Sequence, residues 1–441
     1  MVSSFYLRFL SCFIGVLALW MPNTYSQSVA HQRCAAFEKG LNISNWLEST
    51  WQENWPTANG YTKNDLQDMK DAGITSLRLP IQFAAVVDTV APYTVDTAHV
   101  LFSRVDTVIA WATELDMRVI IDNHHGWDLT TENWRSKMDA FTHLWSVLAQ
   151  RYSTLDPEMF TFELLNEPAI LFPNDSLRII FSTAIDSIRQ HTTAHTIIVS
   201  PHFGSSALAL PLMEPYADTN LIYTWHTYDP LDFTHQGLTW NEPFFPSGNP
   251  FPHEDTTLLE TWVYDGWQNV QNWKNEHGLP LFLGEFGVCN YADDESACNW
   301  MTLIGTNLRD MEIPWFYWDW RYDFAMFHSS TVSADSIIPC FRTALGLYGD
   351  NSLSVDQPTH QSTAMDVLLY PNPVAVGEQF NIRLSDSELS TVQITDMTGR
   401  IVSEKTSAAM DFQVTAPETN GLYLISIKQK EQVAHVKLLV R

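Results

Sequence analysis

Between residues 36 and 348 the chain repeats one pattern, in which a short apolar run is followed by a stretch with apolar residues at helical spacing. The runs are rich in β-branched and aromatic residues, as expected of buried strands. Eight such runs occur, at residues 36–44, 74–80, 117–125, 159–167, 195–202, 221–228, 279–286 and 313–320.

Two of the intervening stretches are clear helix candidates. Residues 62–73 begin with Thr62 and Asp65 in the positions of a capping box, and Gly73 suits the position just past the helix end. Residues 137–152 place apolar side chains at helical spacing. Alternating strands and helices predict an α/β fold, and eight units favour a closed (β/α)₈ TIM barrel over an open doubly wound sheet. The open sheet remains an alternative.

The pattern changes near residue 349. Residues 349–365 are polar and rich in turn formers, which predicts a linker. Beyond them, short alternating runs without helical spacing predict a small all-β sandwich over residues 366–441. Its expected strands are 366–373, 379–384, 390–402, 411–415, 421–429 and 433–440.

The N-terminus has the pattern of a secretion signal. Arg8 precedes an apolar run at residues 9–21, which is too short to span a bilayer comfortably, and small residues follow at positions 24 and 26. We expect cleavage after residue 26 and a barrel domain over residues 27–348. A retained membrane anchor is the alternative.

Cysteine usage agrees with export. With Cys12 in the expected signal, four cysteines remain, which permits two disulfides in an exported chain. Closeness in sequence favours Cys289 with Cys298 and leaves Cys34 with Cys340, while two other pairings stay open. No Cys-x-x-Cys occurs, which argues against a zinc ribbon.

Charge and composition narrow the ligand class. The formal net charge of −27 repels nucleic acid and anionic lipid, and suits a neutral ligand or a cation, although solubility alone also explains it. The 17 tryptophans fit either flat ligand surfaces or a large core. No Gly-x-Gly-x-x-Gly follows a predicted strand, so we expect no dinucleotide and no other cofactor.

In a TIM barrel, functional residues lie at the carboxyl ends of the strands. The polar and aromatic candidates at these ends are Arg78, His124, His125, Asn166, Glu167, His226, Tyr228, Glu285 and Trp318. Glu167 and Glu285 end the fourth and seventh runs, on opposite sides of the expected barrel mouth. Two carboxylates flanking a bond are what glycoside hydrolysis requires, one protonated as the acid and one ionised as the nucleophile.

The barrel segments resemble those of glycoside hydrolase family 5. The matching segments are 40–48, 76–83, 119–126, 163–168, 226–230, 282–287 and 315–320. The resemblance implies that Glu167 is the acid/base and Glu285 the nucleophile. It implies substrate-binding positions at Arg78, His124, Asn166, His226, Tyr228 and Trp318. It also implies a β-linked polysaccharide substrate, with β-1,4-glucan the first choice and mannan, xyloglucan or β-1,3-glucan left open.

Roles for these side chains follow from their chemistry. Arg78 is expected to hold Glu285 ionised, because a nearby cation lowers a carboxylate pKa, and Tyr228 to donate to the same group. His226 is expected to support Glu167. Asn166 is expected to donate to the sugar 2-hydroxyl, a contact that strengthens in the transition state.

Three further expectations concern the inside of the barrel and the sugar nearest the cleaved bond. His124 would contact that sugar and Trp318 would lie under it. Glu163 shares strand parity with Glu167, so we expect it to meet Arg78.

His125 should face away from His124, because adjacent strand residues alternate, and the two rings would then not share a metal. We expect no metal and a separation of about 5–5.5 Å between the two catalytic carboxyl groups.

The long segment 229–255 is rich in aromatic residues and proline. Trp240, Phe244 and Phe245 either line sugar subsites or pack as a lid, since loops of this length are usually functional. Two other functions remain open, a sugar-binding barrel without catalysis and a metal-dependent hydrolase.

The C-terminal module resembles the sorting domain of the type IX secretion system, in residues 370–373, 392–402, 421–427 and 437–441. The resemblance implies passage across the outer membrane and later removal of the module. A carbohydrate-binding sandwich is the alternative, but residues 364–441 contain no Trp. We therefore expect a secreted or cell-surface monomer whose partners are a polysaccharide and the secretion machinery, with no nucleic acid.

Overall fold

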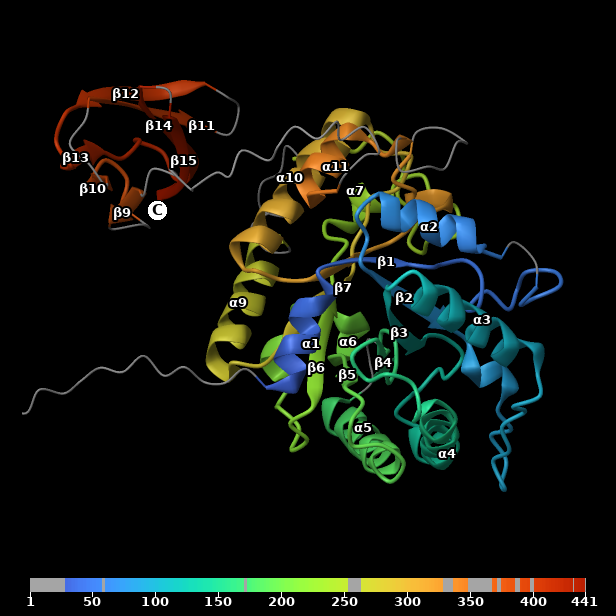
Figure 1. The fold of residues 1–441 in the computed structure, drawn as a ribbon. Helices are drawn as coiled ribbons and strands as arrows, with labels where there is room; N and C mark the ends of the chain where they lie inside the picture. The colour runs from blue at the N-terminus through green and yellow to red at the C-terminus, as the bar shows by residue number, and fades with distance from the viewer. Residues whose placement is uncertain are drawn as a thin grey trace, which may run out of the picture. The chain divides into compact units, whose positions relative to one another are not determined.

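The computed structural model describes residues 28–57, 60–169, 173–252, 263–327, 336–347, 367–370, 374–384, 389–396, 400–430 and 432–440. The chain separates into two compact units, residues 1–351 and 352–441 (Figure 1). The expected signal (1–26) and linker (349–365) lie outside the described residues. Within the described ranges no helix is both long enough and apolar enough to span a bilayer.

The first unit contains a closed barrel of eight parallel strands in chain order, with β8 pairing back onto β1. The strands are β1 (Lys39–Asn42), β2 (Ser76–Ile81), β3 (Arg118–Asn123), β4 (Phe160–Glu163), β5 (Ile197–Val199), β6 (Leu221–His226), β7 (Leu281–Glu285) and β8 (Trp315–Tyr317). Each coincides with one of the eight predicted runs to within a few residues. The TIM barrel is therefore confirmed and the open sheet is wrong.

Helices surround the strands on the outside, as Figure 1 shows for α3, α4, α5, α9 and α10. The α-helices of this unit are α1 (Val29–Phe37), α2 (Lys63–Asp71), α3 (Val100–Glu114), α4 (Trp134–Tyr152), α5 (Asn174–Arg189), α6 (His202–Ser205), α7 (Leu231–Thr234), α9 (Asp265–His277), α10 (Asp294–Asp310) and α11 (Pro339–Leu345). Single 3₁₀ turns lie at η1 (Phe83–Val86), η2 (Leu210–Leu212) and η4 (Tyr322–Phe324).

The predicted capping box of α2 is present. The Asp65 carboxylate accepts from the Thr62 backbone N–H at 2.7 Å, and the Thr62 hydroxyl accepts from the Asp65 N–H. Gly73 follows the helix end with φ of 94°, a conformation that costs glycine little.

Apolar side chains fill the amino end of the barrel. From α1, Cys34 and Phe37 pack against inward-facing residues of the strands, including Phe282 and Phe316. The Phe37 ring meets these two rings edge-on, with centroids 5.4 and 5.5 Å away. A Cβ at Gly40 would lie 2.2 Å from the Phe316 ring, so only glycine leaves room for it there. Because this end is closed by a packed core, polar chemistry is confined to the carboxyl end.

The second unit is a β-sandwich of two antiparallel sheets, with strand orders β13-β10-β9 and β12-β11-β14-β15. The strands are β9 (Val367–Tyr370), β10 (Gln379–Leu384), β11 (Ser390–Asp396), β12 (Ile401–Ser407), β13 (Asp411–Thr415), β14 (Gly421–Gln429) and β15 (Gln432–Val440). Phe380 and Ile382 of one sheet share a buried core with Val392 and Ile425 of the other. The predicted all-β sandwich is confirmed.

One strand of this module was missed in the sequence. The pattern predicts one strand over residues 390–402, but the structure has the hairpin partners β11 and β12 there, with β12 continuing to Ser407. Every residue of β12 is exposed or half-buried. Without a buried face, its sequence lacks the alternation by which strands are recognised.

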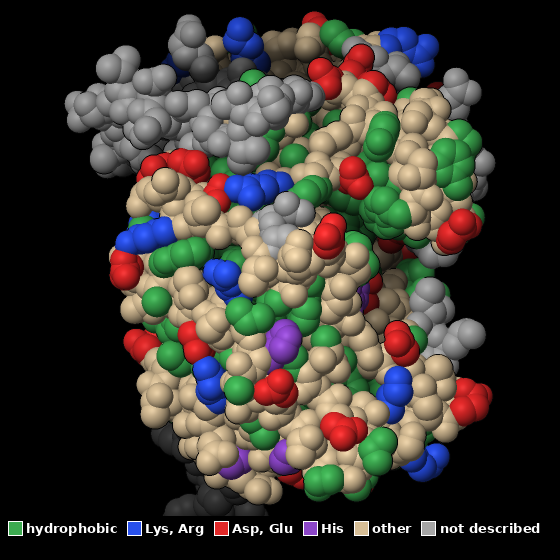
Figure 2. Space-filling model, turned by 90° about the vertical axis from the view of Figure 1, so that its right-hand side faces the viewer, with side chains coloured by type: hydrophobic (Ala, Val, Ile, Leu, Met, Phe, Trp, Pro, Cys, Tyr) green, Lys and Arg blue, Asp and Glu red, His purple; other side chains and the backbone are tan. Residues whose placement is uncertain are grey.

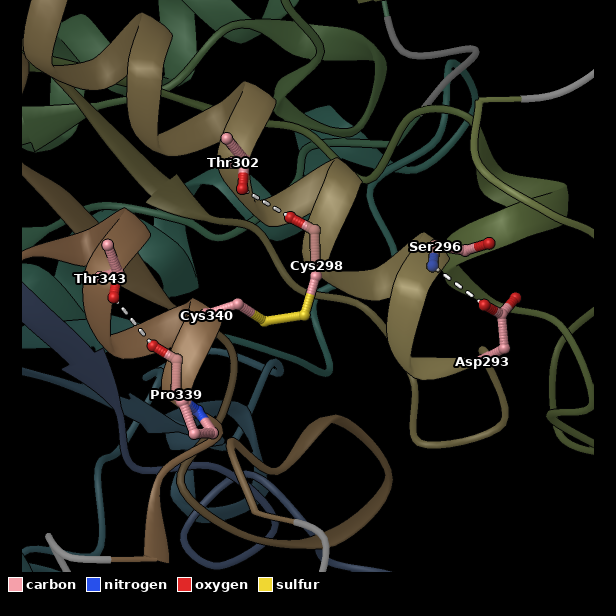
Figure 3. Close-up of a disulfide and its surroundings, with 7 residues drawn as sticks. All are labelled: Asp293, Ser296, Cys298, Thr302, Pro339, Cys340 and Thr343. Atoms are coloured by element: carbon pink, nitrogen blue, oxygen red, sulfur yellow. Dashed lines mark hydrogen bonds between the residues drawn. A yellow bond between two sulfur atoms is a disulfide. The ribbon is translucent and has the colours of Figure 1, made fainter. Parts of the chain in front are cut away.

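Both predicted disulfide pairings are wrong. The disulfide joins Cys298 of α10 to Cys340 of α11, with Cα atoms 5.6 Å apart (Figure 3), whereas Cys34 and Cys289 are buried free thiols. Cys34 lies in the core at the amino end of the barrel, and Cys289 follows β7 at the other end. The helices α10 and α11 lie side by side, which brings together two cysteines 42 residues apart.

Acidic, basic and apolar side chains are intermixed on the face drawn in Figure 2, and the Lys and Arg side chains there are scattered among Asp and Glu.

Candidate active site

A cleft with a volume of about 750 Å³ lies at the carboxyl end of the barrel. Most of the residues predicted for the site line it, namely His124, Asn166, Glu167, His226, Tyr228, Glu285 and Trp318. The remaining one, Arg78, is fully buried and bonds to Glu285 and Asn166 from within the barrel. The cleft thus brings together these residues from five different strand ends, and Arg78 of a sixth strand supports them from within the barrel, as expected of a TIM-barrel active site.

Arg78 on β2 is the centre of a buried polar network. Its Nε and Nη2 donate to the two oxygens of Glu163 at 2.8 and 2.9 Å, which confirms the predicted contact inside the barrel. Its Nη1 donates to Glu285 Oε1 at 2.6 Å and to Asn42 Oδ1 at 2.9 Å. Its Nη2 also donates to Asn166 Oδ1 at 2.9 Å. The planar guanidinium therefore fixes the positions of one catalytic candidate and its neighbouring amide.

The amide of Asn166 has one possible orientation. Because its Oδ1 accepts from Arg78, its Nδ2 must face His124 Nε2, which lies 3.4 Å away, and the cleft. His124 Nδ1 lies 2.5 Å from Asp122 Oδ2, and burial lowers the pKa of His124 well below its usual range, so the ring is neutral. Asn166 is thus held as a hydrogen-bond donor toward any ligand in the cleft.

Glu285 is the last residue of β7 and is almost fully buried. Besides the Arg78 contact, its Oε2 accepts from the Tyr228 hydroxyl at 3.0 Å. Burial raises the pKa of Glu285 to about 6, and the adjacent His226 and the positive charge of Arg78 act against that rise. Both oxygens of this carboxylate are therefore held by donors that favour its ionised form.

Glu167 follows β4 in a backbone conformation with φ of 37°, which is unfavourable for a residue with a Cβ. Its side chain is 38% exposed, and that surface faces the cleft. Its Oε1 lies 2.8 Å from His226 Nδ1. Burial of the carboxyl among the cleft walls raises the pKa of Glu167 to about 7, with Arg78 opposing. The strained residue is thus a carboxyl poised to exchange a proton near neutral pH.

One oxygen each of Glu167 and Glu285, together with a ring nitrogen of His226, lie within 4.8 Å of one another. By distance alone these three groups could ligate a divalent cation. The imidazole and the two carboxylates also suit proton transfer without any metal, and the sequence predicts none.

The expectation for His125 is wrong. Strand β3 ends at Asn123, so His124 and His125 belong to the loop that follows and need not alternate. Both line the cleft, with ring centroids 4.3 Å apart. The ring of Trp318 lies parallel to that of His124 at 5.6 Å. Together these rings form an aromatic wall on one side of the cleft.

Sequence reasoning missed the acidic residues contributed by the loops after β1 and β8. Glu48 and Asp319 line the cleft, and both are buried. Backbone N–H groups of Asn45 and Trp46 donate to Glu48, whose pKa burial raises to about 7. Ser44 donates to Asp319, whose pKa burial raises well above its usual range. Glu48 lies in the loop well past the end of β1, where the strand-end signal does not reach. Asp319 directly follows Trp318 at the end of β8, so the same signal could have found it.

Two tryptophans on the cleft are largely exposed, whereas the other tryptophans among the described residues are buried or half-buried. Trp51 is 67% exposed and Trp240 is 60% exposed. The Trp240 indole donates to Asp323 at 2.8 Å, so its ring is held in place. Trp240 therefore lines the cleft, one of the two roles predicted for it. Phe244 is exposed and is absent from the cleft lining, and Phe245 is not part of that lining either.

Comparison with known families agrees with this geometry. Residues 34–324, about two thirds of the chain, match the model of the cellulase family, glycosyl hydrolase family 5. The chain belongs to this family. Residues 368–441 match the model of the secretion system C-terminal sorting domain. Both resemblances found in the sequence are therefore confirmed.

Family 5 relatives are found at modest identity. Endoglucanase 3 of Fibrobacter succinogenes is 27% identical over 346 residues, covering 67% of this chain and 51% of the relative. Endoglucanase H of Acetivibrio thermocellus is 27% identical over 281 residues, covering 64% of this chain and 29% of the relative. The chain thus spans about half, or less, of the length of these two relatives.

Solved structures are similar over the barrel. Thermotoga maritima Cel5A in complex with cellobiose is 26% identical, with a TM-score of 0.64 and coverage of 72% of this chain and 98% of that one. The same protein in complex with mannotriose is 25% identical, with a TM-score of 0.63 and coverage of 72% and 99%.

Proposed function

We propose that the family 5 domain hydrolyses a β-linked glucan, β-1,4-glucan first, with retention of configuration by double displacement. Glu285 is the nucleophile and Glu167 the acid/base. The observation that carries this proposal is the pair of carboxylates, which meet in one cleft but differ in their surroundings.

The separation of the pair supports retention. Retaining glycosidases hold their two carboxyl groups about 5–5.5 Å apart, whereas inverting ones need about 6.5–9.5 Å to admit a water molecule. One oxygen of Glu167 lies within 4.8 Å of one oxygen of Glu285, and this close approach favours the shorter class.

The surroundings support the assignment of roles. Glu285 accepts from Arg78 and Tyr228, so it ionises first and can attack the anomeric carbon. Glu167 has the higher pKa and is open to the cleft, so between about pH 6 and about pH 7 it keeps its proton for the leaving oxygen. A substrate that displaces cleft water desolvates Glu167 further and strengthens this division. The Asn166 amide, held as a donor, suits the sugar 2-hydroxyl.

Two observations support the choice of substrate. The aromatic wall of His124 and Trp318 and the exposed rings of Trp51 and Trp240 suit the apolar faces of pyranose rings. The relatives named as endoglucanases favour β-1,4-glucan, while the mannotriose complex of the Thermotoga protein makes β-mannan the second candidate. Xyloglucan and β-1,3-glucan rank below both.

The test is hydrolysis of carboxymethylcellulose, glucomannan, xyloglucan and laminarin by the full chain, with the anomer of the first product read by proton NMR. We expect highest activity on a β-1,4-linked substrate and a β-anomer as first product. Glu167→Gln and Glu285→Gln, which keep side-chain size, should each lose at least about 100-fold in kcat while the folded structure is kept. An α-anomer, or activity undiminished in either variant, would reject the mechanism.

We also propose that the exported protein is processed at two places, after residue 26 and within or after residues 349–365, and that the mature barrel acts as a monomer. The sorting-domain match supports export to the cell surface or beyond. Mass spectrometry of the protein recovered from the medium of its natural host would test both positions.

A further inference from the structure

Strand β6 carries a second buried group next to the site. Thr224 lies two residues before His226, on the same face of β6, and its side chain is fully buried. Among the described residues, neither the Thr224 hydroxyl nor His226 Nε2 has a hydrogen-bond partner. No role in the proposed reaction has so far been given to Thr224.

These two unpartnered atoms face the same point. A Cβ built on Gly284 of β7 would lie 2.6 Å from Thr224 Oγ1 and 2.8 Å from His226 Nε2. The two atoms are therefore no farther apart than the sum of these distances. They make no hydrogen bond as placed, and a turn of the Thr224 side chain or one shared water molecule can join them. The missing side chain at Gly284 is what leaves room for the imidazole above β7.

The proton on His226 matters because of its other nitrogen. Burial lowers the pKa of His226 to about 4, so near neutral pH the ring carries one proton, on either Nδ1 or Nε2. Nδ1 contacts Glu167 Oε1 at 2.8 Å. A proton on Nδ1 would be donated to Oε1 and would leave Oε2 to carry the acid proton into the cleft. An unprotonated Nδ1 would instead accept the proton of Glu167 and hold it away from a glycosidic oxygen.

We propose that Thr224 is a positioning residue whose hydroxyl donates toward His226 Nε2 and so keeps the imidazole proton on Nδ1. Nε2 is then an acceptor, Nδ1 is a donor, and Glu167 presents its protonated Oε2 to the leaving group. The proposal rests on the function proposed above, because it assigns Glu167 as the acid.

Charged and titratable groups also surround His226. They are Glu167 and Glu163 from β4 and its loop, Glu285 from β7, Arg78 from β2 and His124 from the loop after β3. Oxygens of Glu167 and Glu285 lie 2.8 and 3.8 Å from Nδ1 and favour a proton there too, whereas the Thr224 hydroxyl lies on the Nε2 side of the ring. Among the described residues, the Thr224 hydroxyl is the donor that shares the Gly284 position with Nε2.

The test compares leaving groups. Thr224→Val keeps the shape of the side chain but removes the hydroxyl, and Thr224→Ser keeps the hydroxyl. We expect Thr224→Val to lose about 10-fold or more in kcat/KM on a β-glucan oligosaccharide, whose leaving group needs protonation, and almost nothing in kcat/KM on a dinitrophenyl β-cellobioside, whose leaving group does not. Thr224→Ser should restore the oligosaccharide rate. The matched control is Thr142→Val on α4, another threonine hydroxyl without a partner among the described residues, which should change neither rate.

Two kinetic outcomes overturn the proposal. An equal fall on both substrates would mean general damage to the site, and no fall on either would mean that Thr224 does not act on His226. If Thr224→Val does not fold, nitrogen-15 NMR of the unmodified protein still decides, because the two imidazole tautomers differ strongly in nitrogen shift. A His226 protonated on Nε2 at pH 7 refutes the proposal. Absence of any hydrolysis by the unmodified protein would instead count against the proposed function. The NMR measurement would still report which nitrogen of His226 carries the proton, whether or not the protein hydrolyses a glucan.

Discussion

Tyr228→Phe isolates one of the contacts that hold Glu285 ionised. The substitution removes only the hydroxyl that donates to Glu285 Oε2 at 3.0 Å. The ring contacts with His235 and Phe324, at centroid distances of 5.0 and 5.8 Å, are kept by phenylalanine. Because burial raises the pKa of Tyr228 well above its usual range, the group is a donor at every pH where the enzyme would be assayed.

The size of the effect follows from the hydrogen bond. A hydrogen bond to an ionised group contributes about 1.5–3 kcal/mol, and one pKa unit corresponds to about 1.4 kcal/mol. Loss of a donor to the carboxylate destabilises its ionised form, so the pKa of Glu285 should rise from about 6 by about one to two units. It then equals or exceeds the pKa of Glu167, which is about 7. The fraction of enzyme with Glu285 ionised and Glu167 protonated falls roughly two- to fourfold at the optimum pH.

The assay is kcat/KM against pH on a soluble β-glucan oligosaccharide. The unmodified protein should give a bell-shaped profile with limbs near pH 6 and pH 7, since activity is lost when Glu285 gains a proton and when Glu167 loses one. In Tyr228→Phe the acidic limb should move to higher pH and the maximum should fall. Tyr152→Phe, which removes a hydroxyl bonded to Asp106 far from the cleft, is the control and should leave both limbs in place. An acidic limb that stays near pH 6 in Tyr228→Phe would refute the reasoning.

Three further predictions concern the network, the disulfide and metal dependence. Arg78→Lys keeps the charge but cannot reproduce the planar contacts to Glu163 and Glu285. We expect roughly a 100-fold loss in kcat and an unfolding free energy lower by about 3 kcal/mol in a denaturant titration, and near-normal stability would contradict this. The double variant Cys298→Ser, Cys340→Ser opens a loop of 42 residues. The added chain entropy of the unfolded state should lower the unfolding free energy by up to about 4 kcal/mol without changing kcat. Equal melting temperatures of the double variant and the unmodified protein would count against this prediction. Treatment with EDTA followed by desalting should leave hydrolysis unchanged, because the proposed chemistry uses only side chains, and loss of activity restored by a divalent cation would favour the metal-hydrolase alternative.

The sequence by itself determined the order of elements and the main candidates of the site. Each barrel strand is a short apolar run between amphipathic helices, so local periodicity is enough to locate it. Parallel strands in a barrel all end at one rim, so the sequence alone predicts that Glu167 and Glu285 share a cleft. Strand parity predicts that Glu163 points into the barrel, because successive side chains point to opposite faces, and Arg78 is an internal base that it can meet there.

The tertiary structure decided what depends on pairs of distant segments. The pairing of Cys298 with Cys340 requires α10 and α11 to lie side by side, and no spacing along the chain reports this. The cleft positions of His125 and Glu48 depend on loops that leave the strands, where the alternation rule no longer applies. The facing of Thr224 and His226 across Gly284 depends on how β6 and β7 pack inside the closed ring. Periodicity is a property of neighbouring residues, whereas contacts between loops, helices and facing strands are set only when the chain has closed into a barrel.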